Sequence, residues 1–244
     1  MRRDKLIPKV IHYCWFGGNP IPSDVKKCIK SWKRMCPDYE IKRWDESNFD
    51  ISEHPFVKTA YNAKAWAFVS DYARLKIIYD NGGIYLDTDV ELLKNLDTLR
   101  KYKCYIGVQQ SGYLCTTGLG FGAEKANSVV KMMLEKYDNI VFDETKKADF
   151  ACPYLNNQVF QSIGYVYDEK KAIEIEGTLV LPPRYLDPIA PGNNMKFLKC
   201  VDTISIHHYS ASWLGKRIRL KRKIIRMIGQ NNMRKIKKVI SLFS

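Results

Sequence analysis

Two carboxylates separated by one residue, Asp87 and Asp89, follow the short apolar segment Ile84-Tyr85-Leu86. Carboxylate oxygens are the ligands that Mg²⁺ prefers in proteins, usually together with substrate phosphates and water. Mn²⁺ accepts the same oxygens and binds imidazole as well. The pair is therefore a candidate site for a divalent cation at the end of a strand, and a chance pair of surface acids is the alternative.

A second pair of charged residues, Asp71 and Arg74, precedes the first pair in the chain. The two lie three residues apart, so on a helix they share a face and can form an ion pair. One interpretation is a solvated salt bridge, which contributes little to stability. The other is a binding device, in which Asp71 accepts hydrogen bonds from sugar hydroxyls while Arg74 offsets nearby negative charge.

Histidines and tryptophans supply further candidates. His207 and His208 end a predicted strand, and neutral imidazole is a common metal ligand, so either could join Asp89 if the chain returns to it. A structural role for both is the alternative. Trp15 and Trp213 are either core residues or platforms on which a base can stack.

Local patterns predict the elements that position these groups. Apolar residues recur at three- and four-residue spacing from Phe68 to Tyr79, which predicts a helix. Asn81-Gly82-Gly83 ends this helix, because glycine adopts the positive φ of a helix C-terminus. The apolar segment 84–86 is typical of a buried strand. Since ligands of open α/β sheets bind beyond the carboxyl ends of the strands, this order makes a plausible ligand platform.

The segments before this helix predict a βαβ unit with a parallel sheet. They are a strand at 8–16, a helix at 23–35 and a strand at 39–44, whereas 55–66 has a weaker helical pattern. The later elements are predicted as strands at 104–108, 118–122, 180–185 and 203–208, helices at 126–137 and 153–163, and a loop at 143–152.

Length and composition indicate one large globular domain with an appendage. The chain has 244 residues, of which 45% are hydrophobic and 12% aromatic, enough for a sizeable core. No apolar run is long enough for a transmembrane helix, and the N-terminal one is too short for a signal peptide, so we expect a cytoplasmic protein. The seven cysteines are scattered without a Cys-x-x-Cys pair, which predicts buried, reduced thiols.

Basic charge is concentrated in residues 214–244. The net charge is +14, yet this segment holds eleven of the 40 basic residues and no acid, which leaves 29 basic and 26 acidic residues elsewhere. Apolar residues interleave with the basic ones, and the segment 229–232 is expected to divide them into two helices. Basic amphipathic helices suit an anionic membrane surface, and a helix packed on the body is the alternative. We therefore expect a domain at 1–213 and a membrane-binding tail at 214–244.

Four motifs occur in an order that resembles glycosyltransferase family 32, the Asp-x-Asp sugar-binding group. They are Ile-Pro-Lys-Val-Ile-His-Tyr-Cys-Trp-Phe-Gly-Gly at 7–18, Ser-Asp-x-x-Arg at 70–74, Gly-Gly-Ile-Tyr-Leu-Asp-Thr-Asp at 82–89 and His-His-x-x-x-Ser-Trp at 207–213. The group includes fungal outer-chain mannosyltransferases, α-1,4-galactosyltransferases and bacterial capsule enzymes. It is also similar to the catalytic domain of the clostridial glucosylating toxins. The resemblance covers residues 7 to about 213.

The resemblance implies a GT-A fold: a Rossmann-like α/β sandwich with a mixed, mostly parallel central sheet that binds a nucleotide sugar and Mn²⁺ or Mg²⁺. It implies that Asp89 and Asp87 form the metal site, with contact of Asp87 to ribose or to metal-bound water as the alternative to direct binding. His207 is implied as the third ligand and His208 as the neighbouring alternative. The implied catalytic residues are Asp71, Arg74, Asp87 and Asp89.

The resemblance also assigns residues to the donor and the acceptor. Asp71, Arg74, Gly83 and Asp87 would hold the donor, Trp15 would stack on its base and Trp213 would cover its diphosphate. Asn157 and Gln158 would lie on the acceptor side, although Cys152 stands where a glycine is usual.

The expected function is metal-dependent transfer of a sugar from a nucleotide sugar to a saccharide or lipid-linked saccharide. A UDP-sugar is the favoured donor and GDP-mannose the alternative. Retention of anomeric configuration, a role in capsule or other surface polysaccharide synthesis, and a location on the inner face of the membrane are expected with it.

Two other functions compete with this one. A haloacid-dehalogenase-like phosphatase also ends a strand in Asp-x-Asp, but that group normally has Thr or Val where this chain has Glu91. A nucleic-acid-binding protein is suggested by the basic charge, but that charge is confined to the apolar-interleaved tail, so we expect no nucleic-acid partner.

Overall fold

The computed structural model describes residues 7–192 and 195–210. Within these ranges a seven-stranded sheet with the order β2-β1-β3-β6-β5-β8-β7 forms the centre of the molecule. β1 is parallel to β2 and β3, β5 is parallel to β8, and the remaining pairs are antiparallel. Five of the seven strands therefore run in one direction, which confirms the expected mixed, mostly parallel sheet. The strands are β1 (Val10–Cys14), β2 (Glu40–Trp44), β3 (Gly83–Tyr85), β5 (Cys104–Val108), β6 (Cys115–Ala123), β7 (Ile173–Ile175) and β8 (Thr178–Leu181).

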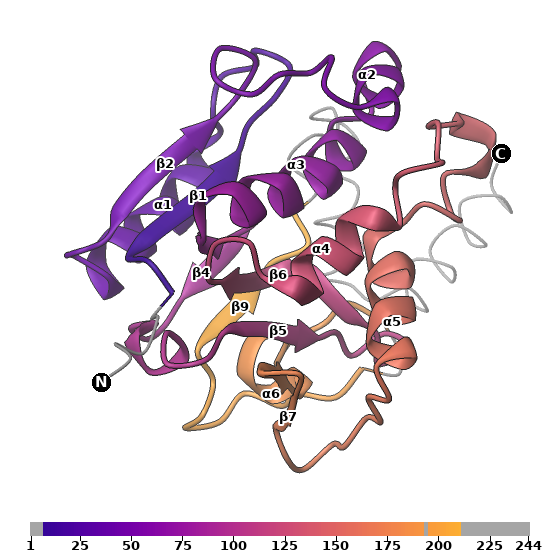
Figure 1. The fold of residues 1–244 in the computed structure, drawn as a ribbon. Coiled ribbons are helices and arrows are strands. Elements are labelled where there is room, and N and C mark those ends of the chain that lie inside the picture. Colours follow the sequence, from indigo (N-terminus) through magenta and orange to yellow (C-terminus); the bar gives the residue numbers. More distant parts are fainter. Residues whose placement is uncertain (1–6, 193–194, 211–244) are drawn as a thin grey trace, which may run out of the picture.

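Helices cover both faces of this sheet, and a second sheet pairs β4 (Val90–Leu92) with β9 (Ser205–His207) (Figure 1). No helix in the described part of the chain is long and apolar enough to span a membrane. The helices are α1 (Ser23–Met35), α2 (Pro55–Asn62), α3 (Trp66–Asn81), α4 (Ser128–Glu135), α5 (Cys152–Ser162) and α6 (Pro183–Leu186), with 3₁₀ turns at Asp97–Leu99 and Glu144–Lys146.

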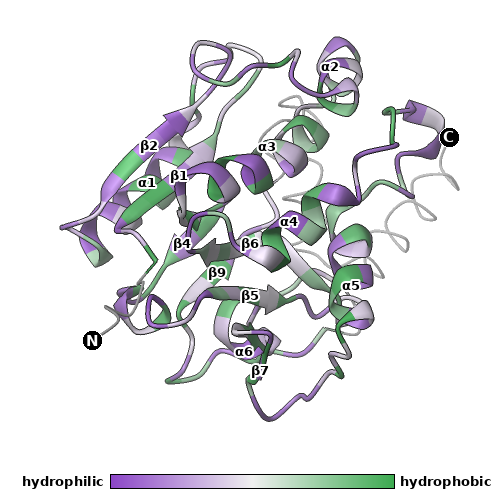
Figure 2. Ribbon diagram, in the orientation of Figure 1, coloured by the Kyte–Doolittle hydropathy of each residue, from purple (hydrophilic) through white to green (hydrophobic). Residues whose placement is uncertain are grey.

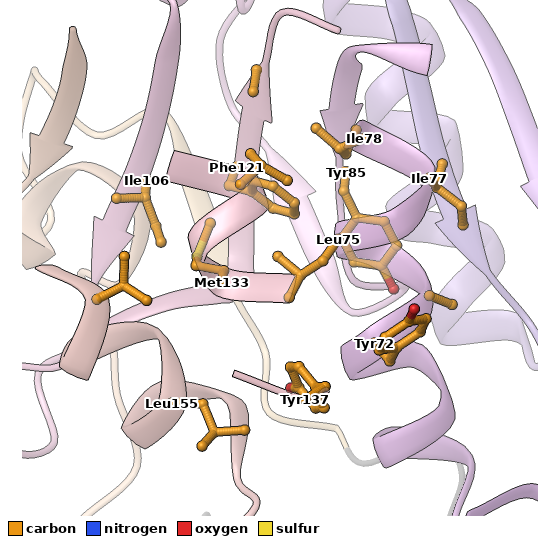
Figure 3. Close-up of a cluster of buried hydrophobic side chains, with 14 of the residues drawn as sticks. Tyr72, Leu75, Ile77, Ile78, Tyr85, Ile106, Phe121, Met133, Tyr137 and Leu155 are labelled. Carbon is orange, nitrogen blue, oxygen red and sulfur yellow. The ribbon is translucent and has the colours of Figure 1, made fainter. Parts of the chain in front are cut away.

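Two hydrophobic clusters lie on opposite faces of the central sheet. Side chains alternate along a strand, so Ile106 of β5 enters one cluster and its neighbour Tyr105 enters the other. The first cluster is covered by α2 to α5, and Figure 3 shows Leu75 of α3, Met133 of α4 and Tyr85 of β3 meeting there. The second is covered by α1, β4 and α6. Figure 2 shows the corresponding mixture of hydrophobic and hydrophilic residues along the helices.

The structure confirms most of the predicted elements and corrects several. The βαβ unit, the central helix and the helices near 126–137 and 153–163 are present. The predicted helix at 55–66 is shorter than expected: α2 ends at Asn62, and Trp66 already belongs to the next helix, α3. The predicted strand at 180–185 is wrong in its second half, where Pro183 begins α6. All seven cysteines are free, as predicted, but Cys200 is exposed.

Candidate active site

The two carboxylates of the Asp-x-Asp motif lie in a turn that carries the chain from the central sheet to the second sheet. Gly82 and Gly83, with φ of 68° and 106°, end α3 and start β3. β3 lies between β1 and β6. After β3 the backbone N–H of Val90 donates to the carbonyl of Asp87 at 2.9 Å, which closes the turn. The motif is thus held at the carboxyl end of a central strand, as the sequence predicts.

The pairing of β4 with β9 brings His207 to this turn. The two strands are antiparallel with Val90 opposite His207, and Nε2 of His207 lies 3.0 Å from Oδ1 of Asp89. One ligand atom from each of Asp87, Asp89 and His207 lies within 4.8 Å of the others. We call these three residues the acid–histidine cluster. His208 instead places Nε2 2.9 Å from Glu91, so the fold brings His207 to the motif.

Asp89 is held as an anion. Its Oδ2 accepts hydrogen bonds from the backbone N–H and the hydroxyl of Ser210, at 2.8 and 3.2 Å. Burial opposes ionisation, but the contact with His207 and these hydrogen bonds prevail and lower the pKa of Asp89. Conversely, burial disfavours the charged form of His207 but Asp89 raises its pKa. A charged and rigidly held carboxylate is ready to bind a cation.

Arg74 links the two charged pairs of the sequence. Its guanidinium lies 2.9 Å from Oδ1 of Asp71 and 3.1 Å from Oδ1 of Asp87, with only 4% of its side chain exposed. The Tyr85 hydroxyl donates to the same Asp87 oxygen at 3.1 Å, and the Tyr85 ring lies 4.9 Å from the guanidinium. The pair Asp71–Arg74 is therefore no solvated salt bridge, because it is buried beside the Asp-x-Asp motif.

The site holds more carboxylates than cationic side chains, because Asp71, Asp87 and Asp89 lie beside Arg74 and His207. Burial raises the pKa of Asp71 to about 6 although Arg74 opposes the shift, and Asp87 adds to it. Burial also raises the pKa of Asp87 against the effect of Arg74, with repulsion from Asp89 contributing. Carboxylates crowded in this way resist ionisation together, and a bound cation would relieve that repulsion.

The donor atoms fit a hard divalent cation. Ligands held about 2.1 Å from one ion lie at most about 4.2 Å apart, so atoms already within 4.8 Å need only small movements of their side chains. Two carboxylates suit Mg²⁺ and Mn²⁺, and the imidazole of His207 suits Mn²⁺ better. The residues present therefore match the metal that the resemblance implies.

β6 and α5 pack beside Asp87 and Arg74. A Cβ atom on Gly118 of β6 would lie 2.9 Å from Oδ2 of Asp87 and 3.3 Å from a guanidinium nitrogen of Arg74. Cys152, at the start of α5, places its sulfur 3.9 Å from Arg74 and 3.6 Å from the Thr116 hydroxyl. The cysteine that replaces the usual glycine is thus packed against the arginine.

The other predicted residues make local contacts of their own. Trp15 is buried, with 8% of its surface exposed, and its indole N–H donates to the Asn19 carbonyl at 2.6 Å. Gly83 lies at the opposite end of β3 from Asp87. Asn157 accepts a hydrogen bond from the backbone of Cys115 in β6 at 3.3 Å, whereas Gln158 is exposed.

Trp213 and the tail at 214–244 lie outside the described residues. Their predicted roles, like those of Trp15, Gly83, Asn157 and Gln158, stay predictions.

Sequence reasoning missed Ser210, Gly118 and the hydroxyl of Tyr85 as parts of the site. Ser210 lies between the histidines and Trp213, inside the last motif, which was the available signal. Gly118 belongs to the glycine-rich run of β6, which indicates a strand closely approached by other groups. Nothing in the sequence indicated which groups those would be.

Comparisons with known proteins indicate a sugar-binding region in this part of the chain. Residues 22–106 match the family model described as glycosyltransferase sugar-binding region containing DXD motif. The chain is 34% identical over 119 residues to inositol phosphoceramide mannosyltransferase 3 of Schizosaccharomyces pombe, covering 47% of this chain and 33% of that protein. It is 32% identical over 97 residues to an uncharacterised glycosyltransferase of Acanthamoeba polyphaga mimivirus, covering 37% of this chain and 39% of that one. The chain thus spans about a third of the length of the curated relatives it matches.

A solved structure supports the fold. The PaToxG glycosyltransferase superposes with a TM-score of 0.53 over 65% of this chain and 71% of that chain, at 20% identity. Together with the central sheet and its flanking helices, this likeness confirms the expected GT-A fold. The matches also confirm the resemblance to the DXD-containing glycosyltransferases of family 32.

Proposed function

We propose that this chain, which carries the DXD-containing sugar-binding region of glycosyltransferases in residues 22–106, transfers a sugar from a nucleotide sugar to a saccharide acceptor with the help of Mn²⁺ or Mg²⁺. The observation that carries the proposal is the acid–histidine cluster, with the buried Asp71–Arg74 pair directly behind it. Both lie at the carboxyl end of β3, where ligands of α/β sheets bind.

The chemical difficulty of such a transfer is the departure of a nucleoside diphosphate from the anomeric carbon. A divalent cation bound at the cluster supplies Lewis-acid stabilisation of the charge that develops on the leaving phosphates. Asp89, which Ser210 holds, and His207 would hold the ion, while Arg74 keeps Asp87 in place and adds positive charge. Asp71 accepts hydrogen bonds from the donor sugar. Retention of anomeric configuration is part of the proposal by resemblance.

The proposed classes of donor and acceptor are inferred from the same resemblance. A UDP-sugar remains the favoured donor, and GDP-mannose gains support from the fission-yeast relative, an inositol phosphoceramide mannosyltransferase. The acceptor is a saccharide or lipid-linked saccharide of a capsule or other surface polysaccharide. The basic tail would hold the enzyme at the inner face of an anionic membrane, close to such an acceptor.

Substitution of one metal ligand tests this function. Asp89→Asn removes the charge that binds the cation while the amide oxygen can still accept the hydrogen bonds of Ser210. We expect the protein to stay folded and to lose more than 99% of its Mn²⁺-dependent hydrolysis of nucleotide sugars, measured over a panel of UDP- and GDP-sugars. Glu91→Gln is the matched control, because Glu91 contacts His208 outside the cluster, and should keep most of the activity. Activity of Asp89→Asn near that of the unchanged protein would contradict the proposal.

A further inference from the structure

Asp187 is a buried carboxylate that the proposed function does not use. It directly follows α6, and 0% of its surface is exposed. Its Oδ2 accepts a hydrogen bond from the backbone N–H of Gln110 at 2.8 Å, and the Gln110 side chain donates to the Asp187 backbone carbonyl at 2.9 Å. Its Oδ1 is buried and has no hydrogen-bond partner among the described residues. A buried carboxylate oxygen without a donor is costly, so a donor near this atom would stabilise the protein.

His207 has a buried ring nitrogen that complements this oxygen. Its Nε2 lies 3.0 Å from Asp89 and belongs to the acid–histidine cluster. Its Nδ1 is buried and, within residues 7–192 and 195–210, has no hydrogen-bond partner. A neutral imidazole that binds a metal through Nε2 carries its proton on Nδ1, and this N–H needs an acceptor. His207 therefore supplies a donor and Asp187 an acceptor.

The pairing of β4 with β9 determines the side to which His207 projects. Val90 lies opposite His207 and Leu92 opposite Ser205, and residues directly opposite each other on antiparallel strands share one side of a sheet. Val90 and Leu92 belong to the second hydrophobic cluster, together with Leu186 of α6. His207 and Ser205 thus project towards the cluster that α6 covers.

α6 is attached to the chain just before β9, beside which it lies (Figure 1). The backbone N–H of Ile204 donates to the carbonyl of Tyr185 in α6 at 2.8 Å. From this bond, Asp187 is two residues further along one segment and His207 three residues further along the other. The end of α6 and the inner side of β9 therefore bring the two buried groups to the same region of the second cluster.

The two groups also interact electrostatically. Burial raises the pKa of Asp187, whereas the hydrogen bond from Gln110, the hydroxyl of Tyr209 and the charge of His207 oppose this shift. Burial lowers the pKa of His207, whereas Asp89 and, with a smaller effect, Asp187 raise it. Each group therefore favours the charged form of the other.

We propose that Asp187 is a positioning residue of the metal site, which accepts the Nδ1–H of His207 and so leaves the lone pair of Nε2 for the cation; the inference rests on the proposed function. Outer carboxylates of this kind fix the tautomer and the ring orientation of metal-binding histidines and make them more basic. In this role Asp187 acts through His207 and touches neither the cation nor the sugar.

The variant Asp187→Asn reverses the direction of the hydrogen bond to His207. The amide oxygen accepts from the backbone N–H of Gln110, so the NH₂ group takes the place of Oδ1 and donates towards Nδ1. The imidazole then carries its proton on Nε2, the nitrogen that the cation needs. We expect the full chain with Asp187→Asn to bind Mn²⁺ about 10- to 100-fold more weakly in a calorimetric titration, the size typical of outer partners of metal ligands.

A matched control separates positioning from folding. Gln110→Leu removes the side-chain hydrogen bonds to the carbonyls of Asp187 and Lys196 but keeps the backbone N–H that binds Oδ2. We expect both variants to lower the melting temperature, and Gln110→Leu to keep the Mn²⁺ affinity of the unchanged protein. A loss of affinity in Gln110→Leu as large as in Asp187→Asn would overturn the inference, because distortion of this region would then explain both.

Nitrogen-15 NMR of the unchanged chain with Mg²⁺ tests the tautomer without any substitution. We expect Nδ1 of His207 to have the chemical shift of a protonated ring nitrogen. An unprotonated Nδ1, or equal Mn²⁺ affinity of Asp187→Asn and the unchanged protein, would overturn the inference while leaving the proposed function intact. Failure of the unchanged protein to bind Mn²⁺ would overturn both.

Discussion

Gly118 is a single residue at which an added methyl group would disturb the acid–histidine cluster. A methyl group at this position would lie 2.9 Å from Oδ2 of Asp87, the flexible end of a side chain, and 3.3 Å from Arg74. Asp87 would therefore have to rotate, whereas the backbone of β6 need not change. We expect Gly118→Ala to fold normally and to bind Mn²⁺ on the order of tenfold more weakly, a size typical of changes around metal ligands, measured by calorimetric titration.

A second glycine provides the control for that prediction. A Cβ on Gly107 of β5 would also meet a side chain at 2.9 Å, but that side chain is the apolar Leu186. Gly107→Ala should lower the melting temperature through overpacking and leave Mn²⁺ affinity unchanged. Equal Mn²⁺ affinity in Gly118→Ala and the unchanged protein would show that Asp87 is not a ligand.

At this scale the sequence predicted the charged groups and missed their neutral neighbours. Asp71, Arg74, Asp87 and His207 were candidates because they belong to motifs that occur in one order along the chain, although each motif alone also has a structural interpretation. Ser210 and Gly118 reach the site through pairings between distant strands, β4 with β9 and β3 with β6. The residue type of a serine or a glycine does not indicate which distant strand it will lie beside. Its neighbours in the site are therefore known only from the fold.

Among the elements, the turn between α3 and β3 depends on one buried histidine. The indole N–H of Trp44 in β2 donates to Nδ1 of His12 at 3.0 Å, so Nε2 carries the proton and donates to the carbonyl of Gly82 at 3.1 Å. Gly83 packs so closely on this ring that a Cβ would lie 2.8 Å from Nε2. His12 thereby ties three strands together at the turn that starts β3.

This histidine predicts a pH dependence of stability. Burial lowers the pKa of His12 from 6.5 to about 4. Between these values the unfolded chain binds a proton that the native protein excludes, so stability rises with pH. The contribution, about 3 kcal/mol from the shift, is complete above pH 6.5 and is lost as the pH falls towards 4. Urea unfolding at pH 4.5, 5.5 and 7 should show a much flatter dependence for His12→Gln than for the unchanged protein.

The control replaces a less buried histidine. Burial also lowers the pKa of His54, but this residue caps α2 near the surface. His54→Gln should therefore keep most of the dependence. An equally steep dependence in His12→Gln would assign the effect to other groups.

Elements with clear periodicity were predictable from the sequence, whereas two of the four three-residue strands, β4 and β7, were missed. α1 and α3 have long apolar patterns and clear ends, and both are found where expected. β4 and β7 have three residues each, too few for any alternation to appear. The missing prediction of β4 mattered most, because its pairing with β9 is what delivers His207 to Asp89.

For the whole molecule the uneven charge is the main feature without a place in the site. The basic excess lies largely in residues 214–244, outside the described part of the chain. The described part has its own group of cations on the exposed side of α1, comprising Lys26, Lys27, Lys30, Lys33 and Arg34. None of these five forms an ion pair with another described residue. These two groups of cations therefore allow a test of whether the position of the basic residues, rather than the total net charge, determines membrane binding.

Two full-length variants with the same net charge test whether the tail binds membranes. In one, Lys216, Arg217, Lys221, Arg222 and Lys223 are replaced by Gln, and in the other the five cations of α1 are replaced by Gln. Each basic residue near an anionic surface contributes about 1 kcal/mol, so we expect the tail variant to lose at least a hundredfold in partitioning to vesicles containing phosphatidylserine. The α1 variant should bind like the unchanged protein in the same sedimentation assay. Equal losses in both variants would mean that net charge alone attracts the protein, and an undiminished tail variant would exclude the tail as the anchor.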